Sequence, residues 1–409
     1  MNNTSNSMYS TFKKVAANHV ALSPLSFLPR AANLFPNKDA VIYGDRKYSW
    51  SECYNRCRSL ASAILKLGVS TGDTVSVIAA NTPEMVEAHY GIAMAGAVLN
   101  SINVRLDSDT IAYILDHGEA KVLFTDREFS ETIKDALAIA SVKPTVIDVD
   151  DILAPSGDLL GKCDYEEFIG SGESDYKWAM PSDEWNAISL NYTSGTTGNP
   201  KGVVYHHRGA YMNAIGDILS WNMSQSPIYL WTLPMFHCNG WCFPWTMSAI
   251  IGTHVCLRHV RPMPIWNALS EHKVTHLCGA PIVMSTILSA EKKERHLLEN
   301  RVEFFTAAAP PPENILTEMK ASGFNVTHLY GLSETYGPSV VNEWHQEWDA
   351  LDEGLQANLK ARQGVRYLPL ESLDVMNPET MESVPHDGKT IGEVMFRGNV
   401  VMKGYFKNK

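Results

Sequence analysis

YTSGTTGNPKG, the stretch Tyr192–Gly202, carries the strongest signal in this chain of 409 residues. It lies between two strand-like apolar runs, AISLN and VVYHH. Its hydroxyl-bearing and glycine residues are Ser194, Gly195, Thr196, Thr197 and Gly198. Glycine allows backbone conformations that turn N–H groups inward, and N–H and hydroxyl groups together can surround phosphate oxygens. Lys201 adds a compact positive charge at the end of the loop, so the pattern predicts a phosphate-binding loop between two strands.

Two other phosphate-binding motifs do not fit this loop. A Walker A loop needs a lysine directly after its second glycine, and a dinucleotide-binding loop needs the spacing GxGxxG. Neither pattern is present in YTSGTTGNPKG. Because loops rich in Gly and Ser are often simply flexible, composition alone leaves a phosphate-binding loop and a flexible connection both open.

The stretch as a whole closely resembles the signature loop of the adenylate-forming superfamily. This superfamily comprises acyl-CoA synthetases, peptide-synthetase adenylation domains and firefly-type luciferases, and its loop contacts the β- and γ-phosphates of ATP. The resemblance therefore implies that the chain binds ATP, with catalytic roles for Thr196 and Lys201 and a metal-binding role for Thr193. The nucleotide-binding residues that it implies here are Thr193, Ser194, Gly195, Thr196, Thr197, Gly198 and Lys201.

A second motif, YGLSET at Tyr330–Thr335, follows an apolar strand-like run. It resembles a family motif in which the tyrosine stacks on adenine, the serine touches the α-phosphate and the glutamate holds Mg²⁺. The resemblance gives these roles to Tyr330, Ser333 and Glu334, and it places Gly331 in both the nucleotide and the acid sites. A carboxylate suits a hard cation that bridges phosphates, so the chemistry agrees with Glu334 as a catalytic metal ligand. Taken alone, a glutamate at this position favours the alternative of a solvated loop residue.

The segment Thr306–Pro310, TAAAP, resembles the family's wall of small residues along the adenine. The residues implied in this wall are Ala307, Ala308, Ala309 and Pro310, with Ala307 also facing the acid. Many relatives carry glycine where this chain has Ala307 and Ala308, so we expect the wall to stand closer to the ligand. The alternative is a plain packed strand end.

The segment Leu233–Trp241, LPMFHCNGW, resembles the motif whose histidine lines the acid pocket and gates the CoA tunnel. His237 takes that position. We expect Trp241, four positions later, to form a wall of the acyl pocket that excludes long fatty tails. Three alternatives stay open: a zinc site of His237, Cys238 and Cys242, a satisfied core histidine, and a core tryptophan. Structural zinc sites usually combine paired cysteines with further distant ligands, which disfavours the first alternative.

Strand-like and helix-like stretches alternate along most of the chain. For example, VSVIA at 75–79 precedes Thr82-Pro83-Glu84, which has the residues of a helix start. Such alternation predicts parallel sheets covered by helices. We expect an α/β fold with two stacked α/β subdomains, whose mostly parallel sheets are covered by helices, and a small β-rich, distorted-barrel subdomain. The expected boundaries are 1–184 for the first subdomain, 185–363 for the second, which holds the ATP and acid sites, and 364–409 for the third.

The resemblance runs from about residue 25 to the end of the chain. It includes Tyr48–Trp50, a structural motif, and Glu393–Gly398, which lies just before the hinge in the family. Relatives continue beyond Lys409 with a ribose-binding aspartate, the hinge and a mobile lid whose lysine contacts the reacting carboxylate. We therefore expect that the lid is absent here, through engineering or cleavage, and that this chain binds substrates yet catalyses poorly.

Composition excludes several classes of protein. The net charge of −11 argues against a nucleic-acid-binding protein. The seven cysteines fit free thiols in a reducing compartment rather than a disulfide scaffold. The N-terminus has no signal-peptide apolar core, so we expect a cytoplasmic protein, while a peroxisomal one stays open because the C-terminus of relatives is missing. Residues 218–257 carry no charged side chain, but prolines and glycines interrupt them, which favours buried core over a membrane span.

The sequence therefore predicts an acid–CoA ligase that uses ATP, Mg²⁺ and coenzyme A. It would convert a small-molecule acid to an acyl-adenylate and then to a thioester. The aromatic run Tyr229–Trp245 resembles a subgroup of methylmercaptopropionate–CoA ligases and plant ligases for benzoate, cinnamate or short-chain acids. The alternatives are a non-catalytic nucleotide-binding module and an amino-acid adenylation domain, for which no secure ammonium-binding aspartate is visible; a luciferase fits the aromatic run less well. Relatives are often dimers, so a homodimer is a further expectation.

Overall fold

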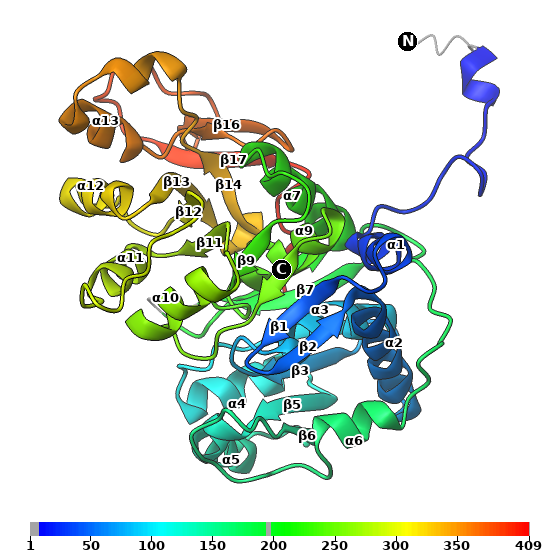
Figure 1. Cartoon of the computed structure of the whole chain (residues 1–409). Coiled ribbons are helices and arrows are strands. Elements are labelled where there is room, and N and C mark those ends of the chain that lie inside the picture. Colours follow the sequence, from blue (N-terminus) through cyan, green and yellow to red (C-terminus); the bar gives the residue numbers. More distant parts are fainter. Residues whose placement is uncertain (1–7, 194–197, 409) are drawn as a thin grey trace.

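The computed structural model describes residues 8–193 and 198–408, which fold into two large sheets covered by helices and a small β unit (Figure 1). The predicted α/β class with two mostly parallel sheets and a small β-rich part is confirmed. The β unit is an antiparallel pair of strands, β16 (Leu370–Met376) and β17 (Glu393–Gly398).

The first large sheet has the strand order β18-β8-β7-β4-β3-β5-β6. The strands β4, β7, β3, β5 and β6 pair in parallel, whereas β8 is antiparallel to both β7 and β18. The bounds are β3 Thr74–Ile78, β4 Val98–Ser101, β5 Val122–Asp126, β6 Thr145–Val149, β7 Ala187–Tyr192, β8 Gly202–His206 and β18 Gly404–Tyr405.

The second large sheet has the strand order β15-β14-β13-β12-β11-β9-β10-β1-β2. Its central strands are parallel, and antiparallel strands close both edges. The bounds are β1 Asp39–Tyr43, β2 Arg46–Ser49, β9 Ile228–Leu230, β10 Thr253–Val255, β11 His276–Gly279, β12 Val302–Thr306, β13 Phe324–Leu332, β14 Gly337–Val341 and β15 Val365–Arg366.

Helices fill the connections between these strands. The α-helices are α1 Phe27–Leu34, α2 Trp50–Lys66, α3 Pro83–Met94, α4 Ser108–His117, α5 Ser130–Ile139, α6 Tyr165–Gly170, α7 His207–Ser220, α8 Cys238–Trp241, α9 Phe243–Ala249, α10 Pro262–Glu271, α11 Pro281–Leu288, α12 Glu313–Ala321 and α13 Glu353–Lys360. The 3₁₀ turns are η1 Met8–Thr11, η2 Pro24–Ser26, η3 Arg127–Phe129, η4 Ser333–Thr335 and η5 Gln346–Ala350.

Local sequence explains where these elements begin. All five residues of β3 are buried, as expected of a parallel strand covered on both faces. Helix α2 begins with a capping box, in which the Glu52 backbone N–H donates to Ser49 Oγ and the Ser49 N–H donates to Glu52 Oε2 at 2.7 Å. Helix α3 begins at Pro83, as the sequence predicts, with Thr82 at the N-cap position, but the Thr82 hydroxyl makes no capping hydrogen bond.

The order of the strands along the chain does not follow their division into two sheets. The strands β1 and β2 come from the first 50 residues but belong to the second sheet, where β1 pairs with β10 and β2 pairs with β1. Conversely, β7 and β8 follow residue 185 but belong to the first sheet. The division at 184/185 therefore stays a prediction about folding units, and the sheets themselves are built from both sides of it.

One continuous hydrophobic core joins the two sheets. It contains Val75 and Phe124 from the first sheet together with Tyr229 and Phe305 from the second. A buried ion cluster, which we name the Arg258 cluster, also spans the two layers: Arg258 contacts Asp126, Asp151, Glu128 and Tyr43. Two of these carboxylates, on Asp126 and Asp151, are fully buried. This shared interior fixes the position of one sheet against the other.

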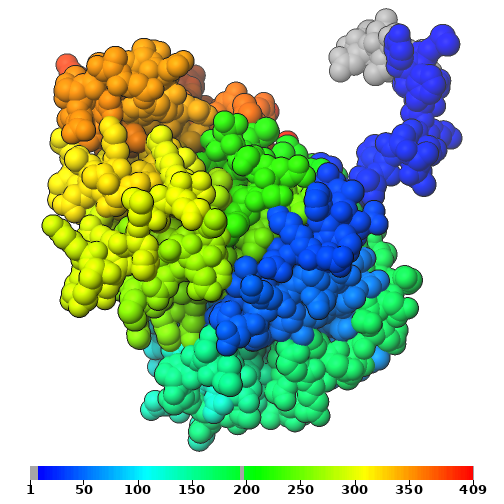
Figure 2. All heavy atoms as spheres, in the orientation of Figure 1, coloured from blue at the N-terminus to red at the C-terminus, as the bar shows by residue number. Residues whose placement is uncertain are grey.

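The uncharged stretch 218–257 is mostly buried around β9, α8, α9 and β10, which agrees with the expected core role. Within the described parts of the chain, every helix is too short or too polar to cross a lipid bilayer. All seven cysteines are free thiols. Residues 8–20 are exposed throughout and extend away from the rest of the molecule (Figure 2).

Candidate active site

The predicted phosphate loop connects the antiparallel strands β7 and β8. At its base the Thr193 N–H donates to the Lys201 carbonyl at 3.0 Å, and the Lys201 N–H donates to Thr193 Oγ1 at 3.3 Å. Gly198 and Lys201 are exposed. Four of the predicted loop residues, Ser194, Gly195, Thr196 and Thr197, lie outside the described residues, so their roles stay predictions.

The second motif is linked to the base of this loop by the segment around β18, which contacts Glu334 and pairs with β8. Glu334 lies in η4, directly after β13, and its carbonyl accepts a hydrogen bond from the Met402 N–H at 2.8 Å. Its carboxylate accepts from the Tyr405 hydroxyl at 2.6 Å, and Tyr405 lies on β18, which pairs with β8. The hydrogen bond to Glu334 raises the pKa of Tyr405 to about 12, so the hydroxyl keeps its proton.

Lys201 lies on the other side of the same tyrosine. Its Nζ is 5.1 Å from the centre of the Tyr405 ring, in cation–π geometry. Among the described residues, neither the Lys201 ammonium nor the Glu334 carboxylate takes part in an ion pair. Both charges therefore remain available to a ligand, the first to phosphate oxygens and the second to a metal ion.

The donor set fits magnesium rather than zinc. Mg²⁺ is usually held by one or two protein oxygens, phosphate oxygens and waters, which suits the half-buried carboxylate of Glu334; the metal-binding role of Thr193 stays a prediction. Across residues 8–193 and 198–408, no three His, Cys, Asp or Glu side chains are grouped to hold a metal ion by themselves. The zinc alternative for His237, Cys238 and Cys242 needs such a group, so the geometry gives it no support.

Ser333 connects the nucleotide side to the predicted acid side. Its hydroxyl is 3.5 Å from Cys238 Sγ, next to His237, and its carbonyl accepts from the Tyr205 hydroxyl at 2.7 Å. The Tyr205 ring stacks on Tyr336 with centroids 3.9 Å apart. The residue predicted to touch the α-phosphate therefore lies against the segment predicted to line the acid pocket.

Tyr330 and Gly331 lie at the end of β13, paired with β14. Tyr330 is half-buried, and its ring centre is 6.0 Å from that of Phe396 on β17. A Cβ atom at Gly331 would lie 2.0 Å from the Gly337 carbonyl oxygen, so only glycine allows the two strands to approach this closely. The glycine that the resemblance places in the nucleotide and acid sites is therefore also required by strand packing.

The predicted small-residue wall follows β12. Ala307 is buried, whereas Ala308, Ala309 and Pro310 are exposed. Ala308 has a φ of 84°, in the region that favours glycine. The alanine is thus held in a conformation that the glycine expected at this position in relatives would adopt without strain.

A cavity of about 630 Å³ brings several predicted residues together. The predicted residues in its lining are His237, Trp241, Ala307 and Ala308. The remaining wall includes the apolar Leu233, Phe236 and Val283 and the cationic Arg105 and Arg261. In the described lining the only carboxylate is that of Glu128, and it pairs with Arg258. The cavity is therefore a largely apolar pocket with positive charge on part of its wall.

The segment between His237 and α9 forms a left-handed turn. Positive φ angles of 49° to 67° occur at five consecutive residues, Cys238, Asn239, Gly240, Trp241 and Cys242. The Asn239 side-chain oxygen anchors this turn by accepting from Ser189 Oγ at 2.6 Å and Asn191 Nδ2 at 2.8 Å. Trp241 packs against Gly337, where a Cβ atom would lie 2.7 Å from the indole. The turn thus fixes Trp241 in the cavity wall.

The imidazole of His237 and the neighbouring thiol influence one another. The charge of a Cys238 thiolate raises the pKa of His237, against the opposing effect of burial. Burial disfavours the thiolate, but the charge of His237 together with hydrogen bonds from His237, Ser333 and Tyr205 lowers the pKa of Cys238. The His237 imidazole and the Cys238 thiol thus lie next to each other where the two predicted sites meet.

Sequence reasoning did not single out Tyr405, Arg105 or Arg261. Tyr405 was visible as part of NVVMKGYF, but its partners lie about 70 and 200 residues earlier in the chain. Arg258 and Arg261 did carry a signal, because they are the first charged residues after the long uncharged stretch that ends at residue 257.

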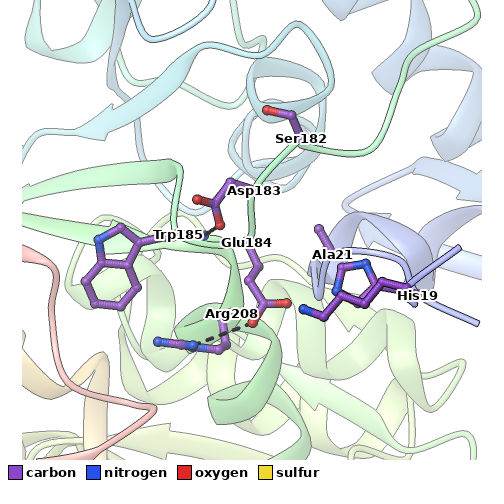
Figure 3. Close-up of a pocket in the computed structure, with 8 residues that line it drawn as sticks. His19, Ala21, Ser182, Asp183, Glu184, Trp185 and Arg208 are labelled. Carbon is purple, nitrogen blue, oxygen red and sulfur yellow. Dashed lines mark hydrogen bonds and ion pairs between the residues drawn. The ribbon is translucent and has the colours of Figure 1, made fainter. Parts of the chain in front are cut away.

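A second cavity, of about 450 Å³, lies at the opposite end of β7 (Figure 3). Figure 3 shows Arg208 directed toward Glu184, with an Nη1–Oε1 distance of 3.6 Å, beside Trp185. Arg208 also lies over the Trp185 ring at 5.1 Å. None of the predicted site residues lines this cavity. Because Arg208 and Glu184 pair with each other here and no predicted residue is present, we place the candidate site in the cavity with His237.

Comparison with known proteins gives consistent results. The model of a family described as AMP-binding enzyme matches residues 28–406. A peroxisomal acetate/butyrate–CoA ligase of Arabidopsis thaliana is 48% identical over 408 residues, covering 97% of this chain and 72% of that protein. A peroxisomal trans-cinnamate:CoA ligase of Petunia hybrida is 44% identical over 410 residues, with the same two coverages.

Among solved structures, the N-terminal domain of FACL13 from Mycobacterium tuberculosis, with inhibitor bound, has a TM-score of 0.81. The alignment covers 95% of this chain and 92% of that one at 21% sequence identity. At this identity the likeness concerns the fold alone.

Proposed function

This chain belongs to the family of AMP-binding enzymes, and from that premise we propose that it activates a short-chain or aromatic carboxylic acid with ATP. It is an AMP-forming acid–CoA ligase. The carboxylate attacks the α-phosphorus of ATP, which gives acyl-adenylate and pyrophosphate. The thiol of coenzyme A then attacks the acyl carbonyl and releases AMP, so the acid ends as a thioester.

The observation that carries this proposal is the position of two unpaired opposite charges beside an apolar cavity. Lys201 and Glu334 both contact Tyr405, and Ser333, next to Glu334, contacts Cys238 beside His237. Charge builds on phosphate oxygens as pyrophosphate leaves, and fixed positive groups stabilise that charge. A site with a cation for phosphate, an oxygen ligand for metal and a pocket for an acyl group fits this reaction.

Each proposed residue has a part in binding or orientation. Lys201 and the loop Thr193–Gly198 would hold the β- and γ-phosphates, while Tyr330 and the wall Ala307–Pro310 would enclose the adenine. Glu334 and Thr193 would hold Mg²⁺, which when bound neutralises phosphate charge. Ser333 would orient the α-phosphate, and His237 and Gly331 would border the reacting carboxylate. Holding the acid and ATP in the orientation that the reaction requires supplies a large part of the rate acceleration.

The cavity favours a short or flat acid. Trp241 is 5% exposed and is fixed by the left-handed turn against Gly337, so its indole cannot easily leave the wall. The relatives act, by their names, on acetate or butyrate and on trans-cinnamate. We propose the same range for this chain, with 3-methylmercaptopropionate as one candidate of suitable length.

Two alternatives make different predictions. An amino-acid adenylation domain would need a carboxylate for the ammonium group, but the described lining offers only Glu128, which Arg258 already engages. A nucleotide-binding module without catalysis would bind ATP and release nothing. A homodimer and the cellular compartment stay predictions.

The test is acid-dependent release of pyrophosphate with Mg-ATP, together with mass-spectrometric detection of the thioester when CoA is added. The panel contains acetate, butyrate, 3-methylmercaptopropionate, benzoate, trans-cinnamate, palmitate and L-phenylalanine. Release with a short or aromatic acid and formation of its thioester support the proposal. ATP binding without release for any acid supports the module, and release with phenylalanine alone supports the adenylation domain.

Replacing Trp241 by glycine tests the acyl-pocket assignment. The variant should keep its fold, because glycine accepts the positive φ at this position without strain. We expect the ratio of kcat/KM for octanoate over butyrate to rise about tenfold or more, since removing the indole opens the wall. Trp185→Gly in the second cavity is the matched control. An unchanged ratio in Trp241→Gly would show that the indole does not limit acid length.

A further inference from the structure

The segment 401–406 is bonded to both halves of the nucleotide site. On one side the Lys403 N–H donates to the Val204 carbonyl at 2.8 Å and the Phe406 N–H donates to the Gly202 carbonyl at 2.6 Å. On the other side the Met402 N–H donates to the Glu334 carbonyl at 2.8 Å. The segment therefore fixes the strand that ends the phosphate loop relative to the metal-binding candidate.

The Tyr405 side chain contacts two opposite charges. Its hydroxyl donates to Glu334 Oε1 at 2.6 Å, and the Lys201 ammonium lies 5.1 Å from its ring centre. In the described part of the chain these are the only polar or cation–π contacts of the two charged groups. The phenol thus contacts both groups that the proposed reaction requires.

This arrangement keeps the two charges from neutralising each other. A lysine and a glutamate on facing segments attract each other, and a direct ion pair would occupy both groups. The Tyr405 ring accepts the cation on its face, which is weaker than a contact with the carboxylate and easily exchanged for a phosphate. Its hydroxyl engages one carboxylate oxygen and leaves the other for a metal ion, as hydrogen-bond partners of metal ligands commonly do.

We propose that Tyr405 is a positioning residue of the nucleotide site, whose ring separates Lys201 from Glu334 and whose hydroxyl orients the Glu334 carboxylate toward the metal ion. The proposal rests on the roles given above to Lys201 and Glu334. It adds a residue that touches neither the acid nor the reacting atoms and acts through two that contact the phosphates and the metal.

The test measures ATP affinity by calorimetry, once with EDTA and once with excess MgCl₂, so that no turnover is needed. The variants are Tyr405→Phe, which keeps the ring, Tyr405→Ala, which removes it, and each of these combined with Glu334→Gln. Tyr54→Phe is the matched control, because its half-buried hydroxyl also makes a single hydrogen bond, accepted from Trp178 Nε1 at 3.0 Å, far from the site.

We expect Tyr405→Phe to bind metal-free ATP with the affinity of the wild type. The factor by which Mg²⁺ raises its affinity for ATP should be about tenfold smaller, as is usual when a partner of a metal ligand is removed. Tyr405→Ala should also weaken metal-free binding, because Lys201 can then pair with Glu334. Adding Glu334→Gln to Tyr405→Ala should restore metal-free binding, since no anion remains to hold the lysine.

Two results would overturn the proposal. The first is that Mg²⁺ raises the ATP affinity of Tyr405→Phe as much as that of the wild type. The second is that adding Glu334→Gln to Tyr405→Ala does not restore the affinity for metal-free ATP. A merely structural tyrosine would instead weaken both affinities equally and lower the melting temperature. A wild-type chain with no Mg²⁺ gain would overturn it as well. Pyrophosphate release tests the proposed function separately, so the two can fail independently.

Discussion

The Arg258 cluster and the Lys201–Tyr405–Glu334 arrangement both gather opposite charges from distant segments, but they treat those charges in opposite ways. Arg258 is 4% exposed and contacts three carboxylates directly, two of them fully buried. Lys201 and Glu334 are reachable by solvent, and each contacts Tyr405 without an ion pair to any described residue. Charges that neutralise one another hold the two sheets together, whereas charges that are kept apart remain available to a ligand.

The largest expected effect on stability comes from a change in the buried Arg258 cluster. Arg258→Leu leaves Asp126 and Asp151 buried without their cation, so the free energy of unfolding should fall by about 3–5 kcal/mol, measured by urea denaturation. Arg397→Leu removes an exposed ion pair with Glu371 and should change stability by no more than about 0.5 kcal/mol. Equal losses in the two variants would mean that the cluster does not stabilise the interface.

Acid should weaken the same interior. Burial lowers the pKa of His89 to about 4 and that of His254 to about 3, whereas both titrate near 6.5 when unfolded. The unfolded state then takes up protons first, so this stability is complete above pH 6.5 and is lost as the pH falls toward 4. Each histidine should contribute a slope of about 1.4 kcal/mol per pH unit in that window.

Urea denaturation at pH 7, 6 and 5 measures this dependence. His254→Gln should show a shallower slope than the wild type, whereas His386→Gln, at an exposed position, should not. A slope in His254→Gln as steep as that of the wild type would contradict the assignment of the buried histidines.

Among the charges that solvent can reach, Glu334→Gln should lower activity but leave stability unchanged. The amide can still accept the Tyr405 hydrogen bond, but it removes the negative charge that would hold Mg²⁺. We expect kcat/KM for the best acid to fall at least about 100-fold, which corresponds to about 2.7 kcal/mol, with an unfolding free energy like that of the wild type. Glu318→Gln on an exposed helix surface is the control. A large loss of stability in Glu334→Gln would show instead that this glutamate stabilises the fold, as the carboxylates of the Arg258 cluster do.

The smallest expected effect concerns the strained wall. Ala308→Gly should raise the free energy of unfolding by about 1 kcal/mol, because the relief of a left-handed alanine exceeds the entropy cost of glycine. Ala309→Gly, whose φ is not positive, should lower it by about 0.5–1 kcal/mol. Thermal denaturation of the two variants decides this, and a shift of the same sign in both would show that the strain at Ala308 is absent in solution.

The features that sequence predicted best are local ones. The loop between two strands, the helix start at Pro83 and the mostly parallel sheets all follow from neighbouring residues. The motif resemblance also named His237, Trp241, Ala307 and Ala308, which line one cavity. The roles of these residues and of the loop from Ser194 to Thr197 stay predictions.

The features that sequence did not predict depend on distant pairing. The strands β1 and β2 join a sheet whose other members begin about 180 residues later, and apolar alternation does not encode that choice. Tyr405 meets Glu334 only because β18 pairs with β8, a contact between short strands about 200 residues apart. Nothing in CNGW identifies a left-handed turn beyond the Asn-Gly pair, which is equally common in ordinary turns.

The left-handed turn at residues 238–242 also bears on how this protein would respond to heat. A left-handed conformation costs about 1–2 kcal/mol for each residue other than glycine, and four of the five residues here are not glycine. That sum is comparable to the net stability of an ordinary domain, about 5–15 kcal/mol. Only contacts such as those of Asn239 with Ser189 and Asn191 keep the turn in place. Warming that loosens these contacts would let the pocket wall relax while both sheets stay folded, so inactivation would precede melting.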